Sequence, residues 1–74
     1  MIKEFEPVVL THDLPVFGLQ AGDVGTVVMV HAGGRGFEIE FTTLTGETVG
    51  VVTVSAEDVR PVGKREIAHV REVA

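Results

Sequence analysis

The sequence predicts a single all-β domain in which five short strands close into a small barrel. Its 74 residues suffice for one domain, and because they include no Cys, the core must form without disulfides or thiolate metal ligands. Valine-rich segments are separated by turns that contain Gly or Pro, as in strands joined by hairpins. A domain this short has a thin margin of stability, so self-association or a partner chain would be a useful supplement.

The first part of the chain predicts two strands joined by a long loop. The first strand covers Phe5–Thr11 and has Pro7 near its start, where a missing N–H is tolerated. The loop over residues 11–21 carries three apolar anchors: Leu14, Phe17 and Leu19. We expect it to fold back over the mouth of the barrel. A turn at Gly22–Asp23 leads into the second strand, Val24–His31, which is apolar on both faces.

The middle of the chain predicts two further strands. Ala32–Gly36 is a glycine-rich hairpin tip. The third strand, Phe37–Thr42, alternates apolar and polar side chains and therefore has one face on the core. After a turn at Leu44–Glu47, the fourth strand covers Thr48–Val54 and contains Gly50, which indicates a bulge or a close backbone approach.

A helical turn and a short strand complete the predicted barrel. Ser55–Val59 has the pattern of one helical turn, with Ser55 as N-cap and Asp58 placed to reach back to it. Arg60–Val62 is the closing strand, so the barrel occupies residues 1–62. The predicted core consists of Val8, Leu10, Leu19, Val27, Met29, Phe37, Ile39, Phe41, Val49, Val51 and Val59.

Residues 63–74 form a C-terminal extension with a different pattern. The extension has apolar residues at helical spacing: Ile67, Val70 and Ala74. This spacing predicts a helix. A helix of about eleven residues is marginal in water, so we expect it to be docked on another surface if it is ordered.

Charge is distributed unevenly along the chain. Residues 1–59 contain two basic and nine acidic side chains, a net charge of −7, whereas residues 60–74 carry a net charge of +2. The acidic body would repel a phosphate backbone. This distribution favours a protein partner or a second copy of the chain over nucleic acid.

The sequence also predicts a cytoplasmic protein without membrane contact. Residues Met1–Glu6 lack the basic and apolar regions of a secretory signal peptide. No apolar run approaches the roughly 18 residues that span a bilayer.

Candidate catalytic and metal-binding residues do not form a known constellation. The three histidines, His12, His31 and His69, lack ligand spacing. Gly33–Gly36 lacks the Gly-Lys-Ser/Thr ending of a phosphate-binding loop. The only serine, Ser55, already has a capping role. We therefore predict a non-enzymatic protein with no catalytic, cofactor-binding or metal-binding residues.

The best candidates for a functional surface are residues that could contact a partner protein. Strands with two apolar faces can leave an apolar patch exposed, and such patches tend to mark interfaces. The predicted contact residues lie in the first loop, in the second faces of strands two and four, and in the extension: His12, Asp13, Phe17, Val28, Val52, Arg65, Ile67 and Val70. The extension could instead cover this patch within one chain, or two copies could associate through it.

The order of elements over Phe5–Val62 resembles the SH3-like small barrel: a long first loop, two tight hairpins and a helical turn before the last strand. Within it, Gly22–Val28 resembles the glycine-containing strand of KOW-type ribosomal and transcription-factor domains. That resemblance implies an alternative function, RNA or DNA binding through the basic extension.

A closer resemblance extends over most of the chain. Five segments carry it: Val8–Pro15, Gly18–Leu19, Ala21–Val28, Phe37–Phe41 and Asp58–Val62. They are similar to domain-of-unknown-function family 4926, a family of short bacterial proteins. The family has no assigned activity to transfer. Its resemblance implies a module that acts with a partner, such as the neutralising, antitoxin-like member of a two-protein system. A structural accessory subunit of a larger enzyme is a further alternative.

Overall fold

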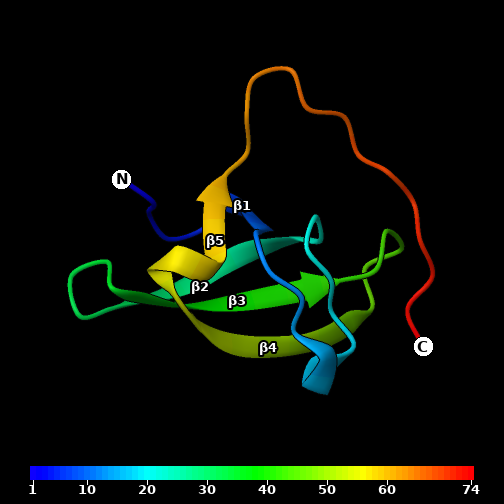
Figure 1. The fold of residues 1–74 in the computed structure, drawn as a ribbon, viewed down its shortest axis with the longest axis horizontal. Helices are drawn as coiled ribbons and strands as arrows, with labels where there is room; N and C mark the ends of the chain where they lie inside the picture. Colours follow the sequence, from blue (N-terminus) through cyan, green and yellow to red (C-terminus); the bar gives the residue numbers. More distant parts are fainter.

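A computed structural model describes residues 1–74, and it contains five strands and two short 3-10 turns (Figure 1). The strands are β1 (Pro7–Leu10), β2 (Val24–His31), β3 (Gly36–Thr42), β4 (Thr48–Ser55) and β5 (Val59–Pro61). The turns are η1 (Pro15–Phe17) and η2 (Ala56–Asp58). The all-β class and the number of strands are as predicted, and most predicted boundaries lie within two residues of the observed ones.

All five strands belong to one antiparallel sheet with the order β4-β3-β2-β1-β5. Strands β2, β3 and β4 are joined by hairpins, and β5 returns to pair with β1. Strands β4 and β5 are the two edges, and no pairing joins them. The sheet is therefore not closed by hydrogen bonds, although it curves around one core in a small barrel-like shape (Figure 1).

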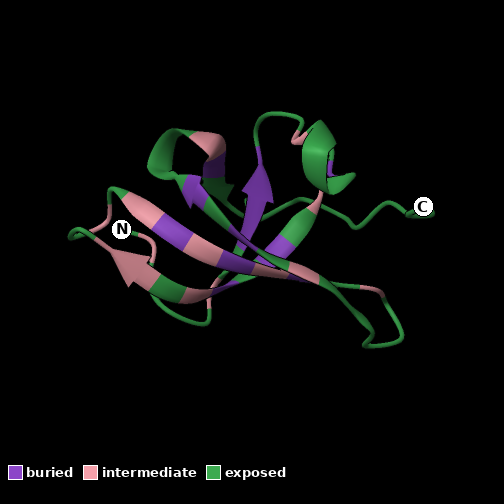
Figure 2. Cartoon of the chain, turned by 90° about the horizontal axis from the view of Figure 1, so that it is seen from below, coloured by how far each residue is buried: buried purple, intermediate pink, exposed green.

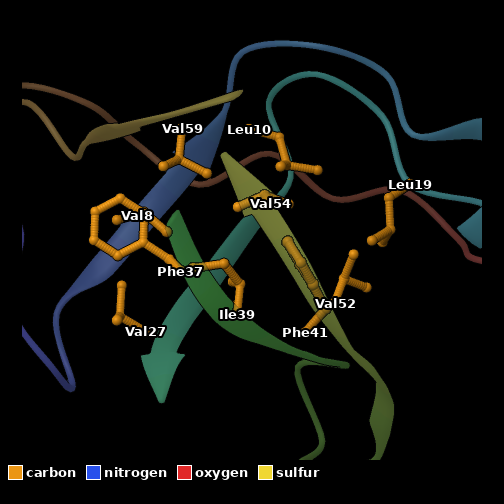
Figure 3. Packing of buried hydrophobic residues seen from close by; sticks show 10 residues of the cluster. All are labelled: Val8, Leu10, Leu19, Val27, Phe37, Ile39, Phe41, Val52, Val54 and Val59. Carbon is orange, nitrogen blue, oxygen red and sulfur yellow. The ribbon is translucent and has the colours of Figure 1, made fainter. Parts of the chain in front are cut away.

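The core lies on the concave side of the sheet, and Figure 3 shows its ten buried residues converging from all five strands and the first loop. They are Val8, Leu10, Leu19, Val27, Phe37, Ile39, Phe41, Val52, Val54 and Val59. Buried and half-buried residues alternate along β3, as predicted, and this alternation appears as bands in Figure 2. Three predicted core residues, Met29, Val49 and Val51, are instead exposed.

A bulge in β2 explains why Met29 is not in the core. Val27 pairs with Ile39, but the next pair along the strand is Met29 with Glu38, so Val28 has no partner of its own. Because successive side chains of a strand alternate between faces, one extra residue moves every following side chain to the other face. Met29 therefore lies beside Glu38 on the outer face, with 46% of its surface exposed.

The predicted inner and outer faces of β4 are exchanged. Val52 pairs with Ile39 and Val54 pairs with Phe37, and residues directly opposite each other share a face. Val52 is consequently only 4% exposed, so the prediction that this contact candidate lies on an exposed face of β4 is wrong. The irregularity expected at Gly50 is present, because the pairing of β3 with β4 shifts next to this residue.

Gly25 leaves room for two core side chains of β3 to pack against the backbone of β2. A Cβ atom at this position would overlap Ile39 Cγ2 and lie 2.9 Å from Phe41 Cε1. Both neighbours belong to the buried core, so neither can move away without disturbing the packing. The glycine in the turn-to-strand segment is thus required by close packing of the core.

The C-terminal extension contains no helix, contrary to the prediction. Figure 1 shows residues 63–74 as one extended segment that leaves β5 and wraps around the outside of the domain. Its length is too short for a stable isolated helix. Two arginine–carboxylate pairs hold it in the extended form, while Ile67 and Val70 remain 93% and 70% exposed.

Candidate interaction surface

The long first loop folds into a compact hairpin with an apolar tip. Leu14 and Leu19 exchange backbone hydrogen bonds, with N···O distances of 2.9 and 3.2 Å. Leu19 is buried and Leu14 is half-buried, so two of the three predicted anchors pack against the core. Phe17, the third, ends η1 at the tip of the loop with 54% of its surface exposed, next to the exposed Val16.

Two carboxylates fix the second half of this loop. Asp13 Oδ1 accepts a hydrogen bond from the Ala21 N–H at 2.8 Å, and Asp23 Oδ2 accepts one from the Gln20 N–H at 2.8 Å. Each bond satisfies a backbone donor that has no partner in a strand. Asp13, a predicted contact residue, therefore has a structural role in shaping the loop.

Arg71 attaches the C-terminal extension to this loop. Its Nε donates to Asp23 Oδ1 at 2.8 Å and its Nη2 donates to Asp23 Oδ2 at 2.5 Å. Nη2 also donates to the carbonyl oxygen of Gly18 at 3.1 Å. A planar guanidinium matches a carboxylate in this two-bond geometry, which fixes both the distance and the orientation of the pair.

The electrostatics of this contact favour the ionised pair. Hydrogen bonding from Arg71 lowers the pKa of Asp23 below its usual value of 3.8, against the opposing effect of burial, and the Gln20 N–H acts in the same direction as Arg71. The same hydrogen bonds raise the pKa of Arg71. Both side chains are largely shielded from solvent, so water competes for the contact less than at an open surface.

A second pair fixes the beginning of the extension. Arg60 Nη1 and Nη2 donate to the two carboxylate oxygens of Glu66 at 2.7 and 2.6 Å. The Gly63 N–H donates to Glu66 Oε1 at 2.5 Å. Together these hydrogen bonds, chiefly those from Arg60, lower the pKa of Glu66 from 4.5 to about 2. The extension is therefore held near both of its ends.

The loop and the extension meet at an ion pair, and the apolar residues next in sequence to the Arg71 contacts, Phe17 before Gly18 and Val70 before Arg71, are exposed. We call this region the loop–tail surface and define it by Val16 and Phe17 of the loop, Val70 of the extension, and the Asp23–Arg71 pair. The Arg71 contact with Gly18 brings the segments that carry Phe17 and Val70 together. A shallow hollow of about 180 Å³ lies beside the pair, between the Gln20–Asp23 turn and His69.

The structure brings only some of the predicted contact residues to this surface. Phe17 precedes Gly18 and Val70 precedes Arg71, the two residues that join loop and extension, and Ile67 extends from the same segment into solvent. His12 and Arg65 are exposed. Val28 is half-buried at the bulge in β2, and Val52 is in the core.

Sequence reasoning missed the two residues that hold the surface together, Asp23 and Arg71. The sequence indicates only a turn at Asp23 and only a positive charge at Arg71. The opposite net charges of the body and the extension were the available signal, because they predict attraction between the two. They could not identify which carboxylate pairs with which arginine.

The histidines and acidic residues form no cluster that could hold a metal ion. No three side chains of His, Asp or Glu come together. His31 Nε2 lies 2.7 Å from Glu38 Oε2 on the outer face of the sheet. The only helical segments are the two 3-10 turns, and neither has the length or apolar character that crossing a membrane needs.

Comparison with known proteins identifies the family. Residues 4–61 match the model of a domain of unknown function, DUF4926. The chain belongs to this family. The DUF4926 match covers all five strands and the first loop, and it ends before the extension that carries Arg71. No curated protein and no solved structure matches the chain.

Proposed function

We propose that this DUF4926 protein is a non-enzymatic interaction module that binds a partner protein through the loop–tail surface. The observation that carries this proposal is the Arg71 side chain, which binds both Asp23 and Gly18 while Phe17 and Val70, each next in sequence to a residue of this contact, remain exposed. A surface that is already ordered loses less conformational entropy on binding. An exposed aromatic residue beside aliphatic ones is a common anchor at protein interfaces.

Binding of RNA or DNA through the extension has less support. Residues 60–74 carry four basic side chains, and two of them, Arg60 and Arg71, are already paired with carboxylates. Phe37 and Phe41 are buried and cannot stack on bases, and the body carries a net charge of −7. Steep loss of affinity with rising salt would favour this alternative, because phosphate contacts release counterions.

The class of partner decides between more specific roles within this proposal. A toxin-like partner would make the protein the neutralising member of a two-protein system, and an enzyme subunit would make it an accessory subunit. Association of two copies through the same surface is the remaining possibility. Each role requires Phe17 and Val70 to be accessible.

The proposal is tested by affinity purification of the tagged protein from its native cells, with and without nuclease. Two variants are compared, the double variant Phe17→Ser/Val70→Ser and the control Leu44→Ser. Leu44 is a suitable control because it is 82% exposed but lies in the β3–β4 hairpin. We expect a stoichiometric partner that survives nuclease, is retained by Leu44→Ser and is lost from the double variant.

Two results would contradict the proposal. Loss of all bound material on nuclease treatment would favour binding of RNA or DNA instead. Equal recovery of the partner with the double variant would show that another surface binds it.

A further inference from the structure

The outer edge of β4 has backbone groups without partners. The Ala56 N–H donates to the Arg35 carbonyl at 2.9 Å, which makes this a hydrogen-bonded pair of the β3–β4 ladder. The register is regular from Gly36 to Phe41, and in an antiparallel ladder hydrogen-bonded pairs alternate. Val54 and Val52 therefore face β3, whereas Val51 and Thr53 direct their N–H and C=O groups away from the sheet. We call these groups the β4 edge.

The neighbouring residue Ser55 agrees with this alternation. Its N–H also points away from β3 and donates to Asp58 Oδ2 at 3.2 Å. No backbone hydrogen bond outside the strand ladders is made by the N–H groups of Val51 or Thr53. The β4 edge therefore offers donors and acceptors at the spacing that an additional strand would pair with.

The two edges of the sheet differ in how they are protected. Strand β5 has three residues, includes Pro61, and carries Arg60, which is engaged by the extension. Proline, charge and short length are the features by which natural proteins protect an edge. Strand β4 has eight residues and contains neither proline nor a charged side chain. Its only irregularity is at Gly50, so the stretch from Gly50 to Ser55 is regular.

The charge around the β4 edge selects the type of strand that could bind. Residues 36–59, which include β3, β4 and η2, contain five acidic side chains and no basic one. Glu40 lies directly opposite Val51 on the outer face, and Glu47 lies in the turn before β4. A second copy of the same edge would bring like charges together, whereas a basic strand would meet opposite charges.

We propose that the β4 edge binds an extended basic segment of a partner protein, which adds to the sheet as a sixth strand. This deepens the proposed function and rests on it, because it names the chemistry of one partner segment. Main-chain hydrogen bonds to Val51 and Thr53 supply affinity, and alternate side chains supply specificity. Basic residues of the added strand lie on the outer face near Glu40, and its apolar residues lie beside Val52 and Val54 at the margin of the core.

The test uses a synthetic peptide, Lys-Val-Lys-Val-Lys-Val, and the complete chain labelled with ¹⁵N. In the free protein, the amides of Val51 and Thr53 should exchange quickly with solvent, and those of Val52 and Val54 slowly. Bound peptide should protect Val51 and Thr53. Replacing Lys with Glu, or methylating alternate peptide nitrogens, should weaken binding by about tenfold or more, because either change removes the proposed interactions.

Protein variants provide the matched controls. Thr53→Pro removes an outward N–H that the fold does not use and should weaken peptide binding by about tenfold, while Thr53→Ala should bind as the wild type does. Slow exchange of Val52 and Val54 in the proline variant shows that it is folded. If that variant does not fold, the methylated peptide still tests the wild-type edge.

Three outcomes would overturn the proposal. One is equal binding of the methylated and unmethylated peptides, and another is equal binding of the Lys and Glu peptides. The third is protection of Val51 and Thr53 in the free protein that rises with concentration, which would identify a second copy as the occupant. The Phe17→Ser/Val70→Ser variant should bind the peptide normally, so failure at the β4 edge is distinguishable from failure of the loop–tail surface.

Discussion

Asp23 and Arg71 are 48 positions apart in the sequence and are joined by two hydrogen bonds of 2.8 and 2.5 Å. Asp23 lies between the first loop and β2, and Arg71 lies near the end of the extension. The pair therefore holds a segment outside the matched family region against the first loop. It determines where the exposed apolar residues of the extension lie.

Replacing Arg71 should release the extension without unfolding the sheet. Arg71→Gln removes the charge and the two-bond geometry that hold Asp23, while the core contains no residue of the extension. We expect ¹⁵N relaxation of residues 67–74 to report much larger motion on the nanosecond timescale, with little change in the midpoint of urea unfolding. Arg65→Gln is the control, because Arg65 makes no ion pair. Equal mobility in both variants would show that Arg71 does not hold the extension.

Acid should release the extension at both attachment points. The pKa values of Glu66, about 2, and of Asp23 both lie below their usual values, so the ion pairs contribute at neutral pH. Their contribution begins to fall as pH drops through the range in which the free carboxyls protonate, and it is lost as pH falls through the lowered pKa values. Carboxyl ¹³C shifts measured against pH would follow both groups.

Arg60→Gln provides the control for the acid titration. It should return the pKa of Glu66 toward 4.5, because hydrogen bonding from Arg60 is the largest cause of the shift. High salt should weaken the Arg60–Glu66 pair, which lies at the surface. A wild-type Glu66 that titrates near 4.5 would show that this pair does not form in solution.

Adding a methyl group at Gly25 should destabilise the fold, whereas the same change at Gly50 should not. A Cβ at Gly25 would overlap the core, and overpacking costs about 1–3 kcal/mol of the free energy of unfolding. A Cβ at Gly50 meets no atom within 4 Å, so Gly50→Ala should change stability by less than about 1 kcal/mol, through the unfolded chain. Urea unfolding of both variants checks the difference. If both variants were equally stable, Ile39 and Phe41 would not pack closely against Gly25.

Val52 and Val51 should differ in how much stability they lose on truncation, although they are adjacent in sequence. Val52→Ala removes buried methyl groups and leaves a cavity, so we expect a loss of about 2–3 kcal/mol. That is a large part of the roughly 3–5 kcal/mol that a core of this size supplies. Val51 is 53% exposed, and Val51→Ala should cost less than about 1 kcal/mol. A larger loss of stability for Val51→Ala than for Val52→Ala would show that Val51 faces the core, as the sequence predicted.

Local patterns were sufficient to predict most of the secondary structure. Apolar and polar residues alternate in β3, and glycine turns mark the hairpins on either side of it. Ser55 and Asp58 predicted the 3-10 turn before β5, and Ser55 N–H and Oγ both donate to Asp58 Oδ2. These features depend on residues that are close in sequence, so their spacing alone was informative.

Tertiary structure decided the faces of two strands and the course of the extension. Valines occupy both faces of β2 and β4, so composition could not distinguish the core face from the outer face. The bulge at Val28 sets the faces of β2, and the pairing of Val52 with Ile39 sets those of β4. Ile67 and Val70 have helical spacing, but they pack against no surface that would stabilise a helix. Arg71 instead binds Asp23, a carboxylate far away in the sequence, and this contact holds the extension in place. The sequence by itself determined which segments pair as strands. Register and long-range ion pairs, which depend on residues far apart in the chain, decided which side chains remain accessible.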